Sequence, residues 1–170
     1  MLPDVLQPGL TLVIAGTAAA PASAVRRRYY AGRGNKFWSL LHDSALVPHP
    51  LNPDRDHTCL EHGIGLTDLN KTVAQSHDRG LTYDVTGFEE RIAAVQPQWV
   101  AFNGLTAGRA WARVVGYPKP GHGIVPTASI AGARVFVLPS SSGANARMPY
   151  SEKLRWWSEL AALTDGARGR

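Results

Sequence analysis

Short apolar runs alternate with amphipathic segments along the whole chain. Buried strands are predicted where the apolar runs have strand length, at residues 10–15, 99–102, 123–125 and 135–138. Helices are predicted where apolar side chains recur at helical spacing, over residues 35–46, 106–115 and 151–163. One more helix is predicted between a cap at Thr86, where Glu89 completes a capping box, and the stop at Pro97.

This alternation predicts an α/β fold, a three-layer α/β/α sandwich around a central, mainly parallel four-stranded sheet. Ligands bind at the carboxyl ends of the strands in such sheets, so we expect the loops after Ala15, Phe102 and Leu138 to converge on one site. The length of 170 residues fits a single domain spanning 1–170. Residues from about 164 to 170 are expected to form a flexible basic tail.

Composition narrows the class of protein. With 44% hydrophobic and 18% charged residues, the chain has the composition of a packed globular protein. A formal charge of +5 favours an acidic partner such as nucleic acid. The single cysteine, Cys59, excludes an internal disulfide and a thiolate-held cluster, and is expected to be a small buried hydrophobe. His57 and His62 are expected on a loop or helix surface, so neither a metal nor a cofactor is predicted.

No stretch approaches the roughly 20 apolar residues that span a bilayer. The first residues, MLPDVLQPG, lack the basic and apolar regions of a signal peptide. We therefore expect a protein of the cytoplasm with no membrane partner, and we expect a monomer.

Five segments of the chain match the sequence motifs of a known family. They read GTAAAPAS at 16–23, YYAGRGNKFW at 29–38, GIGLTDL at 63–69, QPQWVAFNG at 96–104 and LPSSSGANA at 138–146. In this order they resemble the mismatch-specific uracil- and thymine-DNA glycosylases of the uracil-DNA glycosylase superfamily. The resemblance covers nearly the whole chain and implies an enzyme that flips a damaged base out of DNA and cuts it from its sugar, without a cofactor.

The residue that positions the attacking water in the family is missing here. The family's first loop reads GINPG, whereas Ala18 stands at the position of that Asn. A methyl group can neither accept a proton nor orient water. Asn35 is the first candidate replacement, because it stands at the helix start in GNKFW and a side-chain amide can orient water or hold a base edge. A related branch that acts on hypoxanthine also lacks the usual Asn and relies on this position. Asn35 is also a good cap for the helix that follows, and the two roles can coexist.

Asp68 is the second catalytic candidate, since it lies where the thymine-DNA glycosylases have an Asn that contacts the base. An ionised carboxylate can accept a ring N–H but would repel an anionic leaving group. Either its pKa is raised, or it activates water. The alternative to a catalytic role is an Asx turn or helix cap ahead of Leu69 and Asn70.

The resemblance also implies a base-binding set. Tyr30 would stack on the flipped base; the alternative is that Tyr29 and Tyr30 are merely half-buried surface aromatics. Backbone amides of the small early loop would donate to base oxygens. Ser23 would lie beside the pyrimidine 5-carbon, and Asn103 would line the pocket floor or satisfy the end of a strand. The early-loop residues are Gly16, Thr17, Ala18 and Ala19.

A DNA-binding set is implied by the serine-rich loop, which enters the minor groove in the family. The residues at these positions are Ser140, Ser141, Ser142, Gly143, Ala144, Asn145 and Arg147. Ala144 occupies the wedge position and is too small to fill the gap that a base leaves, so Asn145 or Arg147 would substitute. A plain Ser/Gly turn is the alternative. A basic cluster near the tyrosine pair is either a DNA contact or a solvated face, and comprises Arg26, Arg27, Arg28, Arg33 and Lys36.

The sequence therefore favours a monofunctional uracil-DNA glycosylase that uses water as the nucleophile. Its expected partner is DNA containing uracil or another deaminated base. A hypoxanthine-preferring glycosylase is the near alternative. A catalytically silent protein that binds damaged DNA is the alternative from another class, because Ala18 removes the usual catalytic group.

Overall fold

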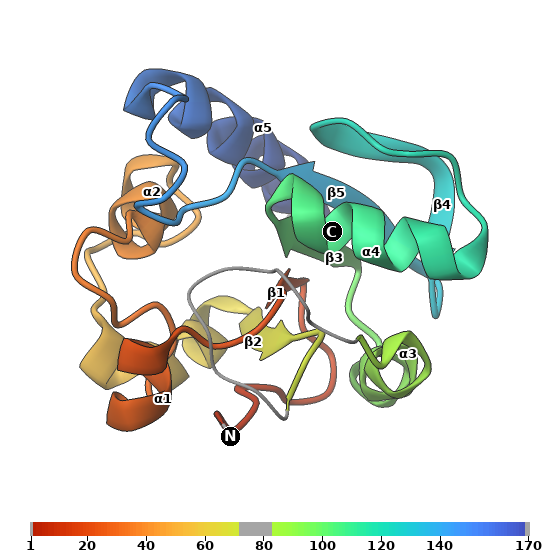
Figure 1. Ribbon diagram of the computed structural model, residues 1–170, viewed down its shortest axis with the longest axis horizontal. Helices are drawn as coiled ribbons and strands as arrows, with labels where there is room; N and C mark the ends of the chain where they lie inside the picture. Colours follow the sequence, from red (N-terminus) through yellow and green to blue (C-terminus); the bar gives the residue numbers. More distant parts are fainter. Residues whose placement is uncertain (1, 72–82, 169–170) are drawn as a thin grey trace.

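A computed structural model of the protein describes residues 2–71 and 83–168. Its centre is a five-stranded sheet with the strand order β2-β1-β3-β5-β4 (Figure 1). β1 (Leu12–Gly16) pairs in parallel with β2 (Ile64–Asp68) and with β3 (Trp99–Asn103), which pairs in parallel with β5 (Ala133–Leu138). The edge strand β4 (Gly123–Ile130) is antiparallel to β5. The carboxyl ends of the four parallel strands therefore meet at one end of the sheet.

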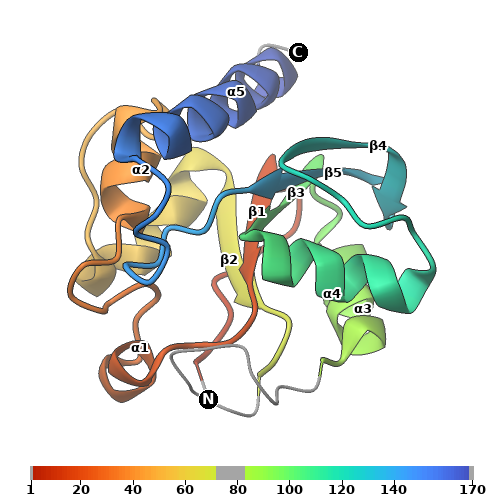
Figure 2. The same cartoon turned by 45° about the horizontal axis from the view of Figure 1, so that its top comes forward.

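Helices cover both faces of the sheet, which produces the three expected layers (Figures 1 and 2). Helices α2 and α5 and the 3₁₀ segment η1 pack on one face, and α3 and α4 pack on the other. The helical elements are α1 (Pro21–Arg26), α2 (Phe37–Asp43), η1 (Pro53–His62), α3 (Val85–Val95), α4 (Leu105–Val115) and α5 (Tyr150–Arg168). No helix in the described ranges has both the length and the apolar character needed to cross a bilayer.

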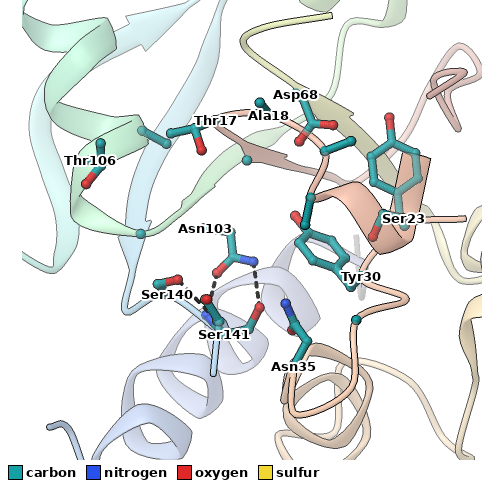
Figure 3. Close-up of a pocket in the computed structure, with 18 of the residues that line it drawn as sticks. Thr17, Ala18, Ser23, Tyr30, Asn35, Asp68, Asn103, Thr106, Ser140 and Ser141 are labelled. Atoms are coloured by element: carbon teal, nitrogen blue, oxygen red, sulfur yellow. Dashed lines mark hydrogen bonds between the residues drawn. The ribbon is translucent and has the colours of Figure 1, made fainter. Parts of the chain in front are cut away.

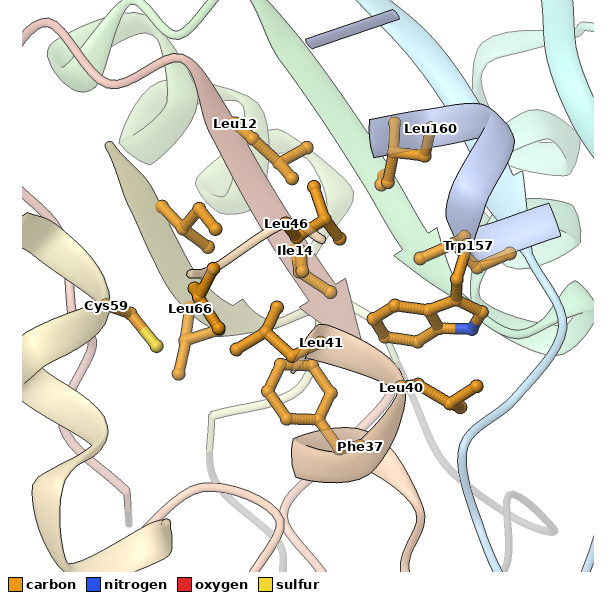
Figure 4. Close-up of a cluster of buried hydrophobic side chains, with 14 of the residues drawn as sticks. Leu12, Ile14, Phe37, Leu40, Leu41, Leu46, Cys59, Leu66, Trp157 and Leu160 are labelled. Atoms are coloured by element: carbon orange, nitrogen blue, oxygen red, sulfur yellow. The ribbon is translucent and has the colours of Figure 1, made fainter. Parts of the chain in front are cut away.

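Side chains of the three central strands β1, β3 and β5 alternate between two hydrophobic cores, as strands covered on both faces require. Ile14 of β1 lies in the core beneath α2 and α5, where it joins Trp157 (Figure 4). Val13 faces the opposite core, which contains Trp111 of α4. Cys59 is fully buried in the first core, which confirms that it is a small buried hydrophobe.

The sheet has one strand more than the sequence predicted. β2 was missed because only Ile64 and Leu66 are large and apolar in the segment IGLTD, yet all five residues are buried. The predicted strand at 123–125 runs on to Ile130, as an antiparallel edge strand with an irregular register between Ile124 and Ser129. The prediction of a mainly parallel sheet is confirmed, with five strands in place of four.

Two helix boundaries also differ from the prediction. α3 is capped by Asp84, whose carboxylate accepts from the Gly87 backbone N–H, so the predicted capping box at Thr86 is wrong. α5 continues through Arg168, and the buried Thr164 donates its hydroxyl to backbone carbonyls of the preceding turn. The segment predicted as a tail thus extends the helix up to Arg168, and residues 169–170 lie outside the described residues.

The outer edge of β2 is covered by the first residues of the chain. Val5 and Leu66 exchange backbone hydrogen bonds of 3.0 and 2.8 Å in an antiparallel bridge. Gly65 allows this close approach, because a Cβ atom at this position would lie 2.6 Å from Leu10 Cδ1 and 3.0 Å from the Val5 carbonyl oxygen. The N-terminal segment therefore packs on β2 only if residue 65 lacks a side chain.

We predict that Gly65→Ala destabilises the fold by about 1–3 kcal/mol, because the added methyl group must displace the N-terminal segment. Chemical denaturation would measure the loss. Gly121→Ala is the matched control, since a Cβ atom there meets nothing within 4 Å. Equal stability of the two variants would contradict the proposed packing at this edge.

Candidate active site

A cavity of about 180 Å³ lies at the carboxyl ends of the parallel strands (Figure 3). This volume is below the roughly 300–1,000 Å³ of sites for drug-sized ligands, so the cavity suits a small ring compound. Sequence-predicted residues make up most of its wall: Gly16, Thr17, Ala18, Ala19, Ser23, Tyr30, Asn35, Asp68, Asn103, Ser140, Ser141 and Ser142. The loops that follow β1, β3 and β5 converge there, as the sequence predicted.

Gly16 brings two polar side chains against the backbone of the early loop. A Cβ atom at this position would lie 2.7 Å from Asp68 Oδ1 and 3.4 Å from Tyr30 Oη. Beyond Gly16 the loop stays paired with the segment after β2, because the backbone N–H of Asn70 donates to the Thr17 carbonyl at 2.7 Å. The amides of Ala18 and Ala19 have no acceptor among the described residues, so both remain available to a ligand.

Tyr30 is held rigidly in the wall of the cavity. Its ring stacks on Phe37 with 3.9 Å between the ring centroids, and its backbone carbonyl accepts a hydrogen bond from Trp38 Nε1. Ser23 Oγ accepts from the backbone N–H of Ala31, which fixes the same turn. Tyr30 thus packs against the core on one side and borders the cavity, so the two interpretations from the sequence are compatible.

Asn35 combines a local structural role with a free donor. Its Oδ1 accepts from the backbone N–H of Phe37, the first residue of α2, at 2.9 Å. Its Nδ2 has no hydrogen-bond partner in the described part of the chain, and the side chain borders the cavity (Figure 3). The N-cap position of α2 is occupied by Lys36 and not by Asn35 as predicted, but the bond to Phe37 orients the Asn35 amide and leaves its N–H groups for a ligand or a water molecule.

Asp68 is the last residue of β2, and its side chain borders the cavity although the residue is only 3% exposed. Burial raises the pKa of its carboxyl group to about 7, with Asp4 adding to the rise and Lys71 and Arg91 opposing it. Near neutral pH the group therefore exists in both charged and neutral forms. The Asx-turn alternative is not observed, because the backbone N–H of Asn70, which would close such a turn, donates to the Thr17 carbonyl.

Asn103 joins the end of β3 to the serine loop. Its Nδ2 donates to Ser141 Oγ at 2.9 Å, and its Oδ1 accepts from the Ser141 backbone N–H at 3.0 Å. Its carboxamide thereby forms hydrogen bonds at the end of β3, which was one of the two alternatives from the sequence. It borders the cavity as well, but its carboxamide is engaged at both ends.

The serine loop is stabilised by its own hydroxyl groups. Ser140 Oγ accepts from the backbone N–H of Ser142, and Ser142 Oγ accepts from that of Ala144. The Ser141 carbonyl accepts from the Lys36 backbone N–H at 2.8 Å, which ties this loop to the start of α2. The remaining members of the predicted DNA-binding set lie outside the cavity wall: Gly143, Ala144, Asn145 and Arg147.

The predicted basic cluster carries less free charge than the sequence suggests. Arg26 pairs with Asp54 at 2.8 Å, and Arg28 pairs with Asp56 at 3.3 Å. The exposed cations of the cluster that have no ion pair among the described residues are Arg27, Arg33 and Lys36.

Sequence reasoning missed other parts of the wall. The first residues of α4, from Leu105 to Ala107, border the cavity, and the FNG segment directly before a predicted helix was the available signal. Leu2 borders it too, and no motif marks the N-terminal segment. Within the described ranges, no cluster of three or more His, Cys, Asp or Glu side chains is arranged to hold a metal ion.

Comparison with known proteins agrees with this geometry. The family model of the uracil DNA glycosylase superfamily matches residues 3–161. The solution NMR structure of a candidate uracil DNA glycosylase from Methanosarcina acetivorans superposes with a TM-score of 0.59 at 24% sequence identity. That match covers 95% of this chain and 96% of the other, and it shows a shared fold.

We predict that Asp68→Asn stabilises the protein at pH 8 by roughly 2–4 kcal/mol, because the folded state then no longer holds a buried charge. The sign follows from the raised pKa. The unfolded carboxyl group ionises near pH 4 and the folded one near pH 7, so the cost grows between these values and is absent below them. Denaturation at pH 4 and pH 8 tests this; an equal effect at both would refute the raised pKa.

Proposed function

The chain belongs to the uracil DNA glycosylase superfamily and is a DNA glycosylase, and we propose from that premise that it removes uracil from DNA. The enzyme flips uracil out of the helix and hydrolyses its N-glycosidic bond with water as the nucleophile. It acts as a monomeric, monofunctional enzyme in the cytoplasm and needs no cofactor. The observation that carries this proposal is the small cavity that joins Tyr30, Asn35 and Asp68 to the serine loop.

The cavity offers a flipped base a stacking surface. Leaving the helix costs a base a few kcal/mol, least when the base is mispaired or in a single strand. The Tyr30 ring can recover part of this cost, since aromatic stacking is worth about 1–3 kcal/mol per base. Phe37 supports the ring from behind, so no ordering of the ring is needed when the base arrives.

Cleavage leaves negative charge on the departing base. Amide donors of Ala18 and Ala19 can stabilise that charge, and they border the cavity without an acceptor among the described residues. In its neutral form, Asp68 donates a further hydrogen bond to a base oxygen. Burial makes this form accessible because it raises the pKa of Asp68 to about 7.

Asn35 replaces the missing Asn as far as the site allows. Its free N–H groups orient the attacking water or hold a base edge, but a carboxamide does not take a proton. General-base help is typically worth roughly 10²- to 10⁴-fold in rate, so its loss is tolerable only for a good leaving group. Uracil is a better leaving group than normal thymine or cytosine. The site therefore favours uracil over both.

The serine loop is proposed to bind the DNA backbone beside the cavity. Its hydroxyl and amide groups near Gly143 suit phosphate oxygens. Ala144 is exposed but small, so it fills the vacated stack poorly, and Asn145 or Arg147 takes over part of that role. Because the gap in the base stack is filled poorly, the cleavage rate should depend only weakly on the base opposite the target.

Ser23 is proposed to lie beside the 5-carbon of the base, where its size limits the room for a methyl group.

Hypoxanthine is the second candidate substrate. It presents a carbonyl next to a ring N–H, as uracil does, and a carboxyl group can bond to both atoms. The buried Asp68 is the observation that keeps this candidate open. A third reading, a silent damage-binding protein, follows from Ala18 alone.

Labelled oligonucleotides carrying uracil, hypoxanthine, xanthine or a thymine mismatch separate these readings when the abasic product is cleaved with alkali. We expect the fastest cleavage with uracil. Faster cleavage with hypoxanthine would make it the substrate. Binding without cleavage of any of them would support the silent protein and refute the enzyme.

We predict that Asn35→Ala lowers single-turnover cleavage at least tenfold, which corresponds to about 1.4 kcal/mol of barrier. Asn35→Ser, which can still accept the capping hydrogen bond, controls for loss of helix stability. Wild-type rates in the alanine variant would remove Asn35 from the mechanism.

Tyr30→Ala should weaken capture of the base, and unchanged kinetics would count against stacking.

The pH dependence of cleavage distinguishes the two roles open to Asp68. If the neutral carboxyl group donates, the single-turnover rate falls as pH rises through about 7. Asp68→Asn keeps an N–H donor that cannot ionise, so its profile should be flat in this range, whereas Asp68→Ala should lose at least tenfold at pH 6. A wild-type rate that rises through pH 7 would instead identify Asp68 as a general base.

A further inference from the structure

A network of charged and polar side chains lies behind the cavity, centred on Asp4. Its Oδ1 accepts from Thr67 Oγ1 at 2.7 Å and lies 2.8 Å from Lys71 Nζ. Its Oδ2 lies 3.3 Å from Arg91 Nε. These partners come from β2, the segment after β2 and α3, so one carboxylate connects three separate parts of the chain.

The N-terminal segment is built into the wall of the site. Leu2 borders the cavity, and its carbonyl accepts from Lys71 Nζ at 2.6 Å. Val5 fixes the other side of Asp4 through its bridge to Leu66. Tyr29 Oη receives a further hydrogen bond from Lys71 at 3.2 Å. Asp4 is therefore held in place from both sides.

The network surrounds Asp68, which directly follows Thr67. Arg91 Nη2 donates to the Asp68 backbone carbonyl at 2.7 Å. Among the described residues, the charged and titratable groups that act on the Asp68 carboxyl group are Lys71, Arg91, Asp4, Tyr29 and Tyr30. Lys71 and Arg91 are cations and lower the pKa of Asp68, whereas Asp4 raises it. Burial is the largest cause of the raised pKa of Asp68, and the balance of these charges sets how far that pKa rises.

We propose that Asp4 is a positioning residue of the active site. It holds Lys71 and Arg91 in ion pairs, and its charge prevents these two cations from keeping Asp68 ionised. Asp4, which does not touch the base, thus keeps the Asp68 carboxyl group in the neutral form that donates a hydrogen bond in the proposed mechanism. This inference rests on the proposed function of Asp68 in cleavage.

The test is Asp4→Asn, which keeps the shape of the side chain and removes its charge. Carbon NMR of the Asp68 carboxyl group, titrated in the full chain, should show its pKa lowered by at least one unit, because an opposing anion is lost and two cations remain. Single-turnover cleavage of uracil DNA should shift its pH profile in the same direction. The variant would then be slow at pH 7.5 and recover the wild-type rate near pH 5.5.

Two further variants complete the test. Glu159→Gln removes a carboxylate from the exposed side of α5 and should leave the Asp68 titration unchanged. Lys71→Met removes one cation and should shift the titration to higher pH, which keeps the inference testable should Asp4→Asn fail to fold. An unchanged Asp68 titration in either network variant overturns the inference. A shifted titration without a shifted cleavage profile supports the role of Asp4 and refutes that of Asp68 in cleavage.

Discussion

The site depends on β1 and β2 staying paired up to their last residues. Gly16 and Asp68 are partners in the parallel register, and backbone bonds from Leu69 and Asn70 continue the pairing into the loop. The Asp68 carboxyl group consequently rests against the glycine backbone, away from bulk water, which is the cause of its raised pKa. Both the Asp68 carboxyl group and the backbone wall against which it lies are thus products of one strand pair.

Most of the layer arrangement could be predicted, because apolar runs and helical spacing are local signals. β2 escaped prediction because only two of its residues are large and apolar, and its burial comes from segments distant in sequence: β1 on one side and the Val5 segment on the outer edge. The cap of α3 was misplaced by two residues, since Thr86 and Asp84 are both good caps and the sequence does not choose between them. Local patterns identify the helices and strands, but contacts across the fold decide which strands form the edges of the sheet and where helices begin.

The cavity wall was predicted more fully than its chemistry. The motifs placed Tyr30, Asn35 and Asp68 together, and the structure brings all three to one cavity. Their hydrogen bonds could not be read from the sequence. The bidentate contact of Asn103 with Ser141 spans 38 residues, and the bond of Thr67 to Asp4 spans 63. Such partners depend on side-chain orientations that are fixed only in the folded state.

The aromatic contacts around Tyr30 join the wall of the cavity to the interior of the protein. Tyr30 stacks on Phe37, and Phe37 in turn packs nearly perpendicular to Trp157 of α5 with 5.5 Å between the ring centroids, so the ring at the cavity is the outermost member of an aromatic cluster in the core. Replacing that ring would disturb the interior as well as the ligand. The aromatic wall of the cavity is therefore coupled to the stability of the interior, and Ser23 shares in this coupling because its hydroxyl group fixes the turn that carries Tyr30.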